Sequence, residues 1–230
     1  MDRFERLQMK ITFVLFDGYT ALDFIGGYEV LARLPGATAN FAALETGIVA
    51  SDTRRLGVVA YQKLEDITEP GILFIPGGPG ARVALQNRQL LEEIRRLHKT
   101  SDWTVGVCNG VELLGKAGLL EGVTVTTNYF SRDDVTGYGA NVVPERFTAD
   151  GKIVTGAGVS ASIDTAFFLA AKIAGESTSR ALQLGIEYYP APPFPDTKAV
   201  DEAPDFIKQI IGAFEDSDAE RAMLAQPTPF

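Results

Sequence analysis

Short apolar runs alternate along the chain with longer segments whose apolar residues recur at helical spacing. The short runs predict buried strands over residues 10–16, 41–44, 71–75, 104–107, 123–127 and 152–155. The longer segments predict helices over residues 21–34, 89–99, 161–174, 177–186 and 205–214. Strands that are apolar throughout and separated by helices indicate a parallel sheet covered on both faces. We therefore expect an α/β fold.

The pattern runs through the chain without an internal repeat or a linker that would separate two domains, so we expect one domain over residues 1–230. Residues 1–8 are predicted to be a flexible N-terminus. Residues 58–61 are expected to form part of a short hairpin. Residues 190–195 read Pro-Ala-Pro-Pro-Phe-Pro and predict an extended arm ahead of the C-terminal helix.

Composition narrows the class of protein. Hydrophobic residues make up 46% of the chain, which is enough for a filled core. The net charge of −9 disfavours nucleic acid as a partner, because binding phosphates requires clustered Lys and Arg. A single cysteine excludes an internal disulfide, and neither a signal peptide nor an apolar stretch of membrane-spanning length is visible. We expect a soluble, cytoplasmic protein that does not bind membranes.

The single cysteine, Cys108, stands where a predicted strand ends and a predicted helix begins, in the sequence Val-Gly-Val-Cys-Asn-Gly. This order is typical of a nucleophile elbow, a sharp turn that presents a reactive side chain at the start of a helix. The helix dipole and free N–H groups there favour a thiolate, so we predict a depressed pKa for Cys108. The alternative is a small buried side chain without chemistry.

A cysteine nucleophile needs a partner that handles protons. The only histidine, His98, lies in a charged helix and is predicted to be on its solvated face, far from the site. Asp23 is the best carboxylate, because apolar neighbours would bury it and raise its pKa; capping its own helix is the alternative role. Asp17 is a weaker candidate, and Glu112 is expected to act only at its helix start.

Glycine clusters also follow three of the predicted strands, at Gly77-Gly78, after Cys108 and at residues 156–158. Ligands bind along the carboxyl edge of open parallel sheets, so these segments are expected to converge on one small site.

Three motifs together resemble the ThiJ/PfpI superfamily: Ile-Pro-Gly-Gly at 75–78, Val-Cys-Asn-Gly at 107–110 and Thr-Gly-Ala-Gly at 155–158. Leu-Asp at 22–23, Tyr-Glu-Val-Leu at 28–31 and Glu-Tyr at 187–188 resemble its isonitrile hydratase branch. The similarity covers roughly residues 9–200 and implies a flavodoxin-like sandwich.

The resemblance implies an enzyme that converts an isonitrile and water into an N-substituted formamide through a thioimidate. Cys108 would be the nucleophile and Asp23 the acid/base. Gly77, Gly78 and Asn109 would line the site, and the N–H groups of Gly78 and Asn109 would act as donors. The resemblance also implies a small-molecule substrate, a homodimer, and neither a cofactor nor a metal.

Two positions depart from the branch. The residue after the cysteine is typically threonine but is Asn109 here, and a typical His-Trp pair is replaced by Asn128-Tyr129. Both departures are expected at the pocket and put the substrate in question. The alternatives are a non-catalytic redox module with an oxidisable Cys108, and a glyoxalase- or amidase-type enzyme of the same superfamily. The missing catalytic histidine counts against an amidase.

Overall fold

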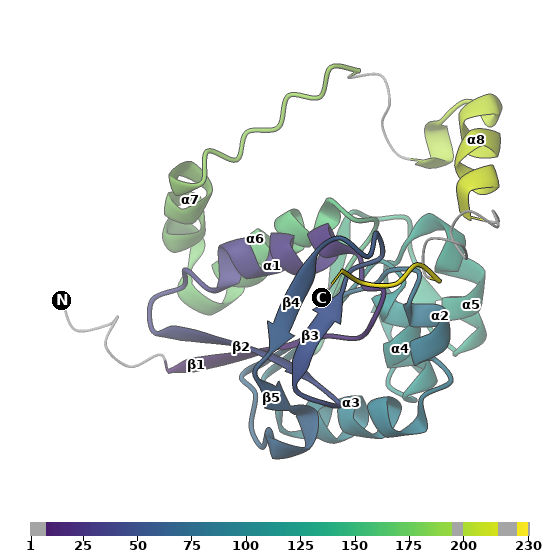
Figure 1. Ribbon diagram of the computed structural model, residues 1–230. Coiled ribbons are helices and arrows are strands. Elements are labelled where there is room, and N and C mark those ends of the chain that lie inside the picture. Colours follow the sequence, from purple (N-terminus) through teal and green to yellow (C-terminus); the bar gives the residue numbers. More distant parts are fainter. Residues whose placement is uncertain (1–7, 195–199, 216–224, 230) are drawn as a thin grey trace.

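The computed structural model describes residues 8–194, 200–215 and 225–229, and within them a seven-stranded sheet forms the centre of the molecule (Figure 1). In spatial order its strands are β10 (Phe147–Asp150), β11 (Ile153–Gly156), β7 (Trp103–Val107), β6 (Ile72–Ile75), β1 (Met9–Val14), β2 (Ala37–Ala43) and β5 (Gln62–Lys63). All neighbours pair in parallel except β10, which runs antiparallel along one edge.

Helices cover both faces of this sheet. Helix α1 packs against α6, and α3 packs against α4; Figure 1 shows these pairs on opposite sides of the strands. The helices are α1 (Ala21–Leu31), α2 (Ala81–Ala84), α3 (Arg88–Thr100), α4 (Gly110–Lys116), α5 (Arg132–Gly137), α6 (Ala161–Ala174), α7 (Glu176–Gly185) and α8 (Asp205–Glu215). Short 3-10 turns are η1 (Leu64–Asp66), η2 (Tyr129–Ser131) and η3 (Val200–Glu202). The predicted α/β sandwich is confirmed.

The central strands are buried because helices lie over both of their faces. Every residue of β6 is fully buried, and Phe74 of that strand packs against Phe13 of β1 with ring centroids 5.0 Å apart. Helix α1 rests directly on this aromatic layer. A Cβ atom at Gly27 would lie 2.4 Å from the Phe74 ring, so glycine allows α1 to approach the sheet this closely. This close packing of α1 on Phe74 determines where the first turn of the helix lies relative to the strand ends.

Two smaller sheets lie beside the main one. β3 (Gly47–Ala50) and β4 (Gly57–Ala60) form the antiparallel hairpin in which residues 58–61 were expected. β8 (Thr124–Val125) and β9 (Asn141–Val142) form a separate parallel pair.

The expectation that residues 123–127 form a strand of the main sheet is therefore wrong. The Thr126 N–H donates to the Thr155 side-chain Oγ1 at 2.8 Å instead of joining a strand ladder. The Thr127 hydroxyl donates to the carbonyl oxygen of Cys108 at 2.8 Å, so this segment crosses over the end of β7.

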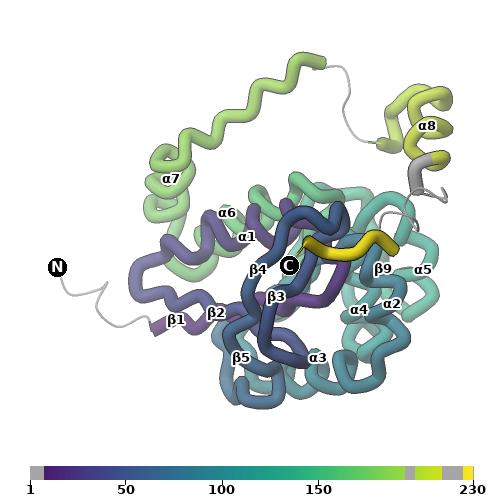
Figure 2. Tube along the Cα trace, viewed as in Figure 1, coloured from purple at the N-terminus to yellow at the C-terminus, as the bar shows by residue number. Residues whose placement is uncertain are grey.

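The C-terminal part returns to the body of the molecule. Arg132 of α5 donates through Nη1 to both carboxylate oxygens of Asp201, at 2.7 and 2.9 Å, and this pair holds η3 against α5. Arg54 Nε donates to the carbonyl oxygen of Gln226 at 3.3 Å, beside the β3–β4 hairpin (Figure 2). Residues 190–194 form neither helix nor strand, as expected for the arm; its last residue, Pro195, and residues 1–7 of the predicted flexible terminus lie outside the described residues.

No helix in the described part of the chain combines the length and the apolar character needed to cross a membrane.

Candidate active site

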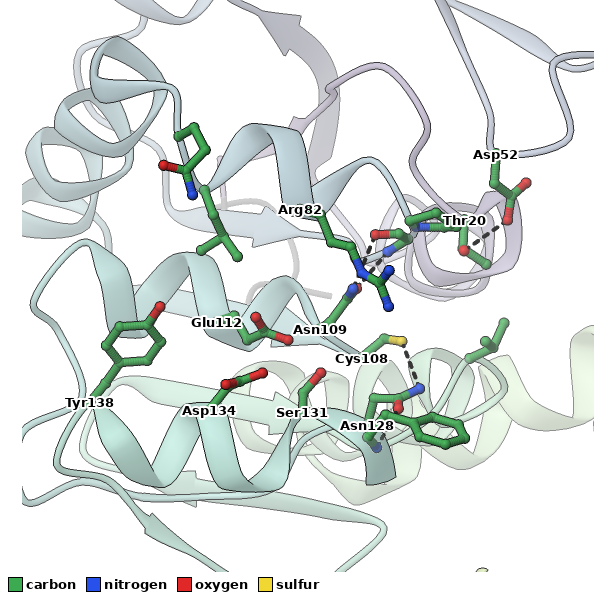
Figure 3. Close-up of a pocket in the computed structure, with 16 residues that line it drawn as sticks. Thr20, Asp52, Arg82, Cys108, Asn109, Glu112, Asn128, Ser131, Asp134 and Tyr138 are labelled. Carbon is green, nitrogen blue, oxygen red and sulfur yellow. Dashed lines mark hydrogen bonds between the residues drawn. The ribbon is translucent and has the colours of Figure 1, made fainter. Parts of the chain in front are cut away.

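Cys108 stands at the predicted elbow, immediately after β7 and two residues before α4 (Figure 3). Its φ angle of 57° lies in the left-handed region, which is uncommon for a residue with a side chain. The Cys108 N–H donates to the carbonyl oxygens of Gly156 and Ala157, at 3.0 and 2.9 Å. These bonds tie the turn to the end of β11 and hold the strained conformation in place, as is typical of functional turns.

Asp23 lies fully buried in the first turn of α1, next to Cys108. Its Oδ2 atom accepts the Gly77 N–H at 2.9 Å, and its Oδ1 atom has no hydrogen-bond partner among the described residues. The carboxyl therefore bonds to a neighbouring loop and does not cap its own helix.

Burial raises the pKa of Asp23 from 3.8 to about 7, and the charge of Asp52 adds to the rise. The Gly77 N–H and the Cys108 thiol oppose it. The predicted upward shift is confirmed, and at neutral pH this carboxyl exists in both protonation states.

The pKa of Cys108 is raised well above its usual value, so the prediction of a depressed pKa is wrong. Burial of the thiol is the largest cause, and the negative charge of Asp23 adds to it. The Asn109 backbone N–H and the Asn128 side chain, whose Nδ2 donates to Sγ at 3.2 Å, act in the opposite direction but are weaker. The free protein holds a thiol, and the adjacent group that can take its proton is Asp23.

Asn109 closes a reciprocal clamp on the loop after β6. The Gly78 N–H donates to Asn109 Oδ1 at 2.7 Å, and Asn109 Nδ2 donates to the Gly78 carbonyl oxygen at 3.1 Å. A Cβ atom at Gly77 would lie 2.3 Å from Asn109 Oδ1 and 2.9 Å from Cys108 Cβ, so only glycine fits there. The Gly78 N–H is therefore already committed to Asn109, which corrects the expectation that it is a donor toward substrate.

A cavity of about 570 Å³ opens in front of Cys108, a size suited to a small molecule. Gly78, Asn109 and Asn128 line it together with the thiol, as expected. Gly77, which was expected beside them, does not line it, because it packs against Asn109 and Cys108 behind the wall; the buried Asp23 does not line it either. Tyr129 does not line it, which corrects its expected place at the pocket. Its ring packs against Phe130, which takes that place on the wall, with centroids 5.1 Å apart.

Charged side chains from separate elements complete the cavity: Asp52 near the β3–β4 hairpin, Arg82 on α2, Glu112 on α4 and Asp134 on α5 (Figure 3). Of these, sequence reasoning weighed only Glu112, as a residue at a helix start. Its position one turn after Cys108 was the signal that could have placed it in the site. No comparable signal exists for the others. Among the described residues, no group of three or more His, Cys, Asp or Glu side chains is placed to hold a metal ion.

His98 lies at the opposite end of β7 from the cysteine. Its Nδ1 atom is 2.8 Å from the hydroxyl of Thr104, near the start of that strand, whereas Cys108 follows the strand's end. The side chain is half-buried, so the expected solvated position is wrong: the Thr104 hydroxyl offers a partner beneath the helix. Burial lowers the pKa of His98. A cysteine–histidine dyad is excluded by this geometry.

A parallel sheet between two helical layers, with an elbow cysteine at a strand end, defines a class of cysteine-bearing α/β sandwiches. The model of the DJ-1/PfpI family matches residues 9–172, and the chain belongs to that family. A ThiJ/PfpI family protein from Pseudomonas syringae has a structure similar to this one, with a TM-score of 0.85 and 27% identity, over 95% of this chain and 91% of that one.

Two proteins that are similar in sequence to this chain carry the names of enzymes. It is 35% identical to the isonitrile hydratase of Pseudomonas putida over 201 residues, which are 87% of each chain. It is 25% identical to the deglycase PfpI of Pyrococcus furiosus over 154 residues, which are 64% of this chain and 89% of the relative.

Proposed function

We propose that this protein hydrates an isonitrile, R–N≡C, to the N-substituted formamide, with Cys108 as nucleophile and Asp23 as acid/base. The observation that carries the proposal is the buried Asp23 carboxyl, whose pKa of about 7 lets it take and return a proton beside the only thiol of the chain. The moderate identity to the isonitrile hydratase of Pseudomonas putida supports the choice of reaction.

In the first half-reaction, the Asp23 carboxylate takes the proton of the Cys108 thiol. It then delivers this proton to the terminal carbon of the isonitrile, which carries the lone pair. The thiolate bonds to the same carbon, and the product is a thioimidate, R–N=CH–S–Cys108. The S–H bond is broken, one C–S and one C–H bond are formed, and Asp23 returns to its starting state.

In the second half-reaction, water adds to the thioimidate carbon. Asp23 takes a proton from the water and passes one to the nitrogen, which gives R–NH–CH(OH)–S–Cys108. This intermediate expels the sulfur as the hydroxyl loses its proton, and Cys108 regains a proton. The products are R–NH–CHO and the free thiol, so the sum is one isonitrile plus one water.

Two N–H donors of the site stabilise the negative charge that the Cys108 sulfur carries as a thiolate. The Asn109 N–H and the Asn128 amide both act on the sulfur and lower the pKa of Cys108, so they stabilise the thiolate at the moment of attack and of departure. Neither donor titrates near neutral pH. The proton transfers are therefore assigned to Asp23 alone.

The test uses purified protein and cyclohexyl isonitrile, with N-cyclohexylformamide followed by proton NMR. We expect the wild-type protein to form the formamide. Cys108→Ala should retain less than a tenth of the rate, because the variant has no nucleophile; a tenfold loss corresponds to about 1.4 kcal/mol of barrier. Activity of the alanine variant above that level contradicts the covalent mechanism. Folding of the variant is checked by circular dichroism.

The redox alternative predicts a different outcome in the same preparation. The redox reading is favoured if no isonitrile is hydrated while hydrogen peroxide oxidises Cys108, one equivalent giving the sulfenic acid and a second the sulfinic acid, as followed by mass spectrometry. The matched variant Asp23→Asn separates the two cases further, because hydration needs a proton carrier and oxidation of the thiolate does not.

A further inference from the structure

We propose that the Cys108 cavity selects substrates whose substituent carries a positive charge, and that Glu112 and Asp134 are the residues that make this selection. The inference deepens the proposed function, since it names the class of R group. The preference for positive charge arises from the side chains of the cavity wall, so it can be measured without an isonitrile or any turnover.

The first observation is the balance of charged side chains on the cavity wall. Asp52, Glu112 and Asp134 contribute three carboxylates, and Arg82 contributes the single guanidinium, so the formal balance is −2. Such a wall stabilises a bound cation and repels an anion. The thiol of Cys108, the nucleophile of the proposed reaction, lines this same cavity.

The second observation is that the Glu112 and Asp134 carboxylates both line the cavity and lie close enough for the charge of Asp134 to act on Glu112. Glu112 comes from the first turn of α4 and Asp134 from α5, and Figure 3 shows both carboxylates on the same side of the cavity as Ser131, beyond the sulfur of Cys108. Burial and the nearby charge of Asp134 both raise the pKa of Glu112, while its hydrogen bond with Ser131 and the charge of Arg82 oppose the rise. A cation between the two carboxylates would relieve their repulsion.

The third observation concerns the direction in which a substrate extends. An isonitrile is linear through carbon, nitrogen and the first atom of R, so R is held away from the sulfur and enters the cavity. Besides the carboxylates, Phe130 and Tyr138 line this space with aromatic rings. Aromatic faces together with carboxylates suit an ammonium group.

The test uses Cys108 as its own reporter, because it is the only cysteine in the chain. Methanethiosulfonates form a mixed disulfide with a thiolate and release methanesulfinate. The trimethylammonium-ethyl and sulfonato-ethyl reagents differ mainly in charge. Their rates with the protein are divided by their rates with 2-mercaptoethanol, which removes the intrinsic difference between the reagents.

We expect a normalised preference for the cationic reagent of at least tenfold at low ionic strength, decreasing in 0.5 M salt because of screening. Glu112→Gln and Asp134→Asn should each reduce it at least threefold. Asp133→Asn is the matched control: it removes one charge from the same helix, but Asp133 does not line the cavity. The control should keep the wild-type preference.

A normalised ratio of one, or equal losses in Asp133→Asn and Asp134→Asn, would overturn the proposal. A preference for the anionic reagent would assign the selection to Arg82 instead. Turnover separates this inference from the proposed function. If neither butyl isonitrile nor a trimethylammonium-propyl isonitrile is hydrated while the reagent preference holds, only the reaction is wrong. If both are hydrated with equal kcat/KM, the charge selection fails and the reaction stands.

Discussion

Replacing Asp23 by asparagine is the most informative single change in this protein. Asparagine keeps the shape of the side chain, and its Oδ1 atom can still accept the Gly77 N–H that Asp23 accepts at 2.9 Å. It cannot take or return a proton. We expect the hydration rate to fall at least about a hundredfold, the lower end for loss of a general acid/base.

The same change should make the cysteine more acidic. The charge of Asp23 is one of the causes that raise the pKa of Cys108, so its removal lowers that pKa. Alkylation by iodoacetamide, measured from pH 6 to 10, should therefore show a midpoint below that of the wild-type protein. A variant with a more reactive thiol and a slower hydration rate is the signature of a lost proton carrier, because loss of the nucleophile would lower both.

The pH dependence of the free energy of unfolding gives an independent measure of the pKa of Asp23. Its pKa of about 7 in the folded protein lies above the value of 3.8 in the unfolded chain, so folding favours the protonated form. This contribution is fully present below about pH 4 and is lost as the pH rises through about 7. At about 1.4 kcal/mol per pKa unit, the loss amounts to about 4 kcal/mol.

Urea unfolding at pH 4.5 and pH 8 measures this difference. The stability of Asp23→Asn relative to the wild-type protein should rise between the two pH values by several kcal/mol, because the variant carries no buried charge. A pH-independent difference would refute the buried, titrating carboxyl. A hydration rate within threefold of wild type would refute its role as acid/base, whatever the stability shows.

Asn109→Ala removes two hydrogen bonds to Gly78 and should cost about 1–3 kcal/mol in urea unfolding; an unchanged midpoint would show that the clamp is dispensable. Asn128→Leu removes the amide that lowers the pKa of Cys108, so iodoacetamide alkylation at pH 8 should slow; an equal or faster rate would contradict this role. His98→Gln should leave the hydration rate and its pH profile unchanged, because His98 lies at the opposite end of β7 from Cys108; a large fall in rate in a folded variant would contradict this. The homodimer expected from the family resemblance predicts a light-scattering mass of twice 24.8 kDa, and a mass equal to one chain would exclude it.

Several features of this protein follow from sequence alone because they depend on neighbours along the chain. The apolar run before Cys108 and the amphipathic segment after it predict the elbow, and the positive φ angle of Cys108 agrees with it. The apolar residues around Asp23 predict its burial and its raised pKa. The alternation of strands and helices along the chain predicts the fold, because elements in this order leave few ways to build a covered parallel sheet. The motifs that resemble the family imply the same fold.

Other features depend on residues far apart in the chain and were decided only by the tertiary structure. Local dipoles favour a thiolate at Cys108, but burial and the charge of Asp23, which lies 85 positions earlier, outweigh them. The Gly78 N–H looks free in the sequence, yet folding brings the Asn109 side chain onto it. Residues 123–127 have the pattern of a core strand, but Thr124–Val125 pair with β9 outside the main sheet, and the Thr126 N–H donates to the Thr155 side chain.

The charged wall of the cavity is the clearest case. Arg82, Glu112 and Asp134 come from three helices, and nothing in their local sequence shows that they share one space. A sequence pattern reports which residues are apolar and which turns are tight, since those depend on a few adjacent positions. The pKa of a group and the charge of a cavity depend on every group that the fold brings near, and that arrangement exists only in three dimensions.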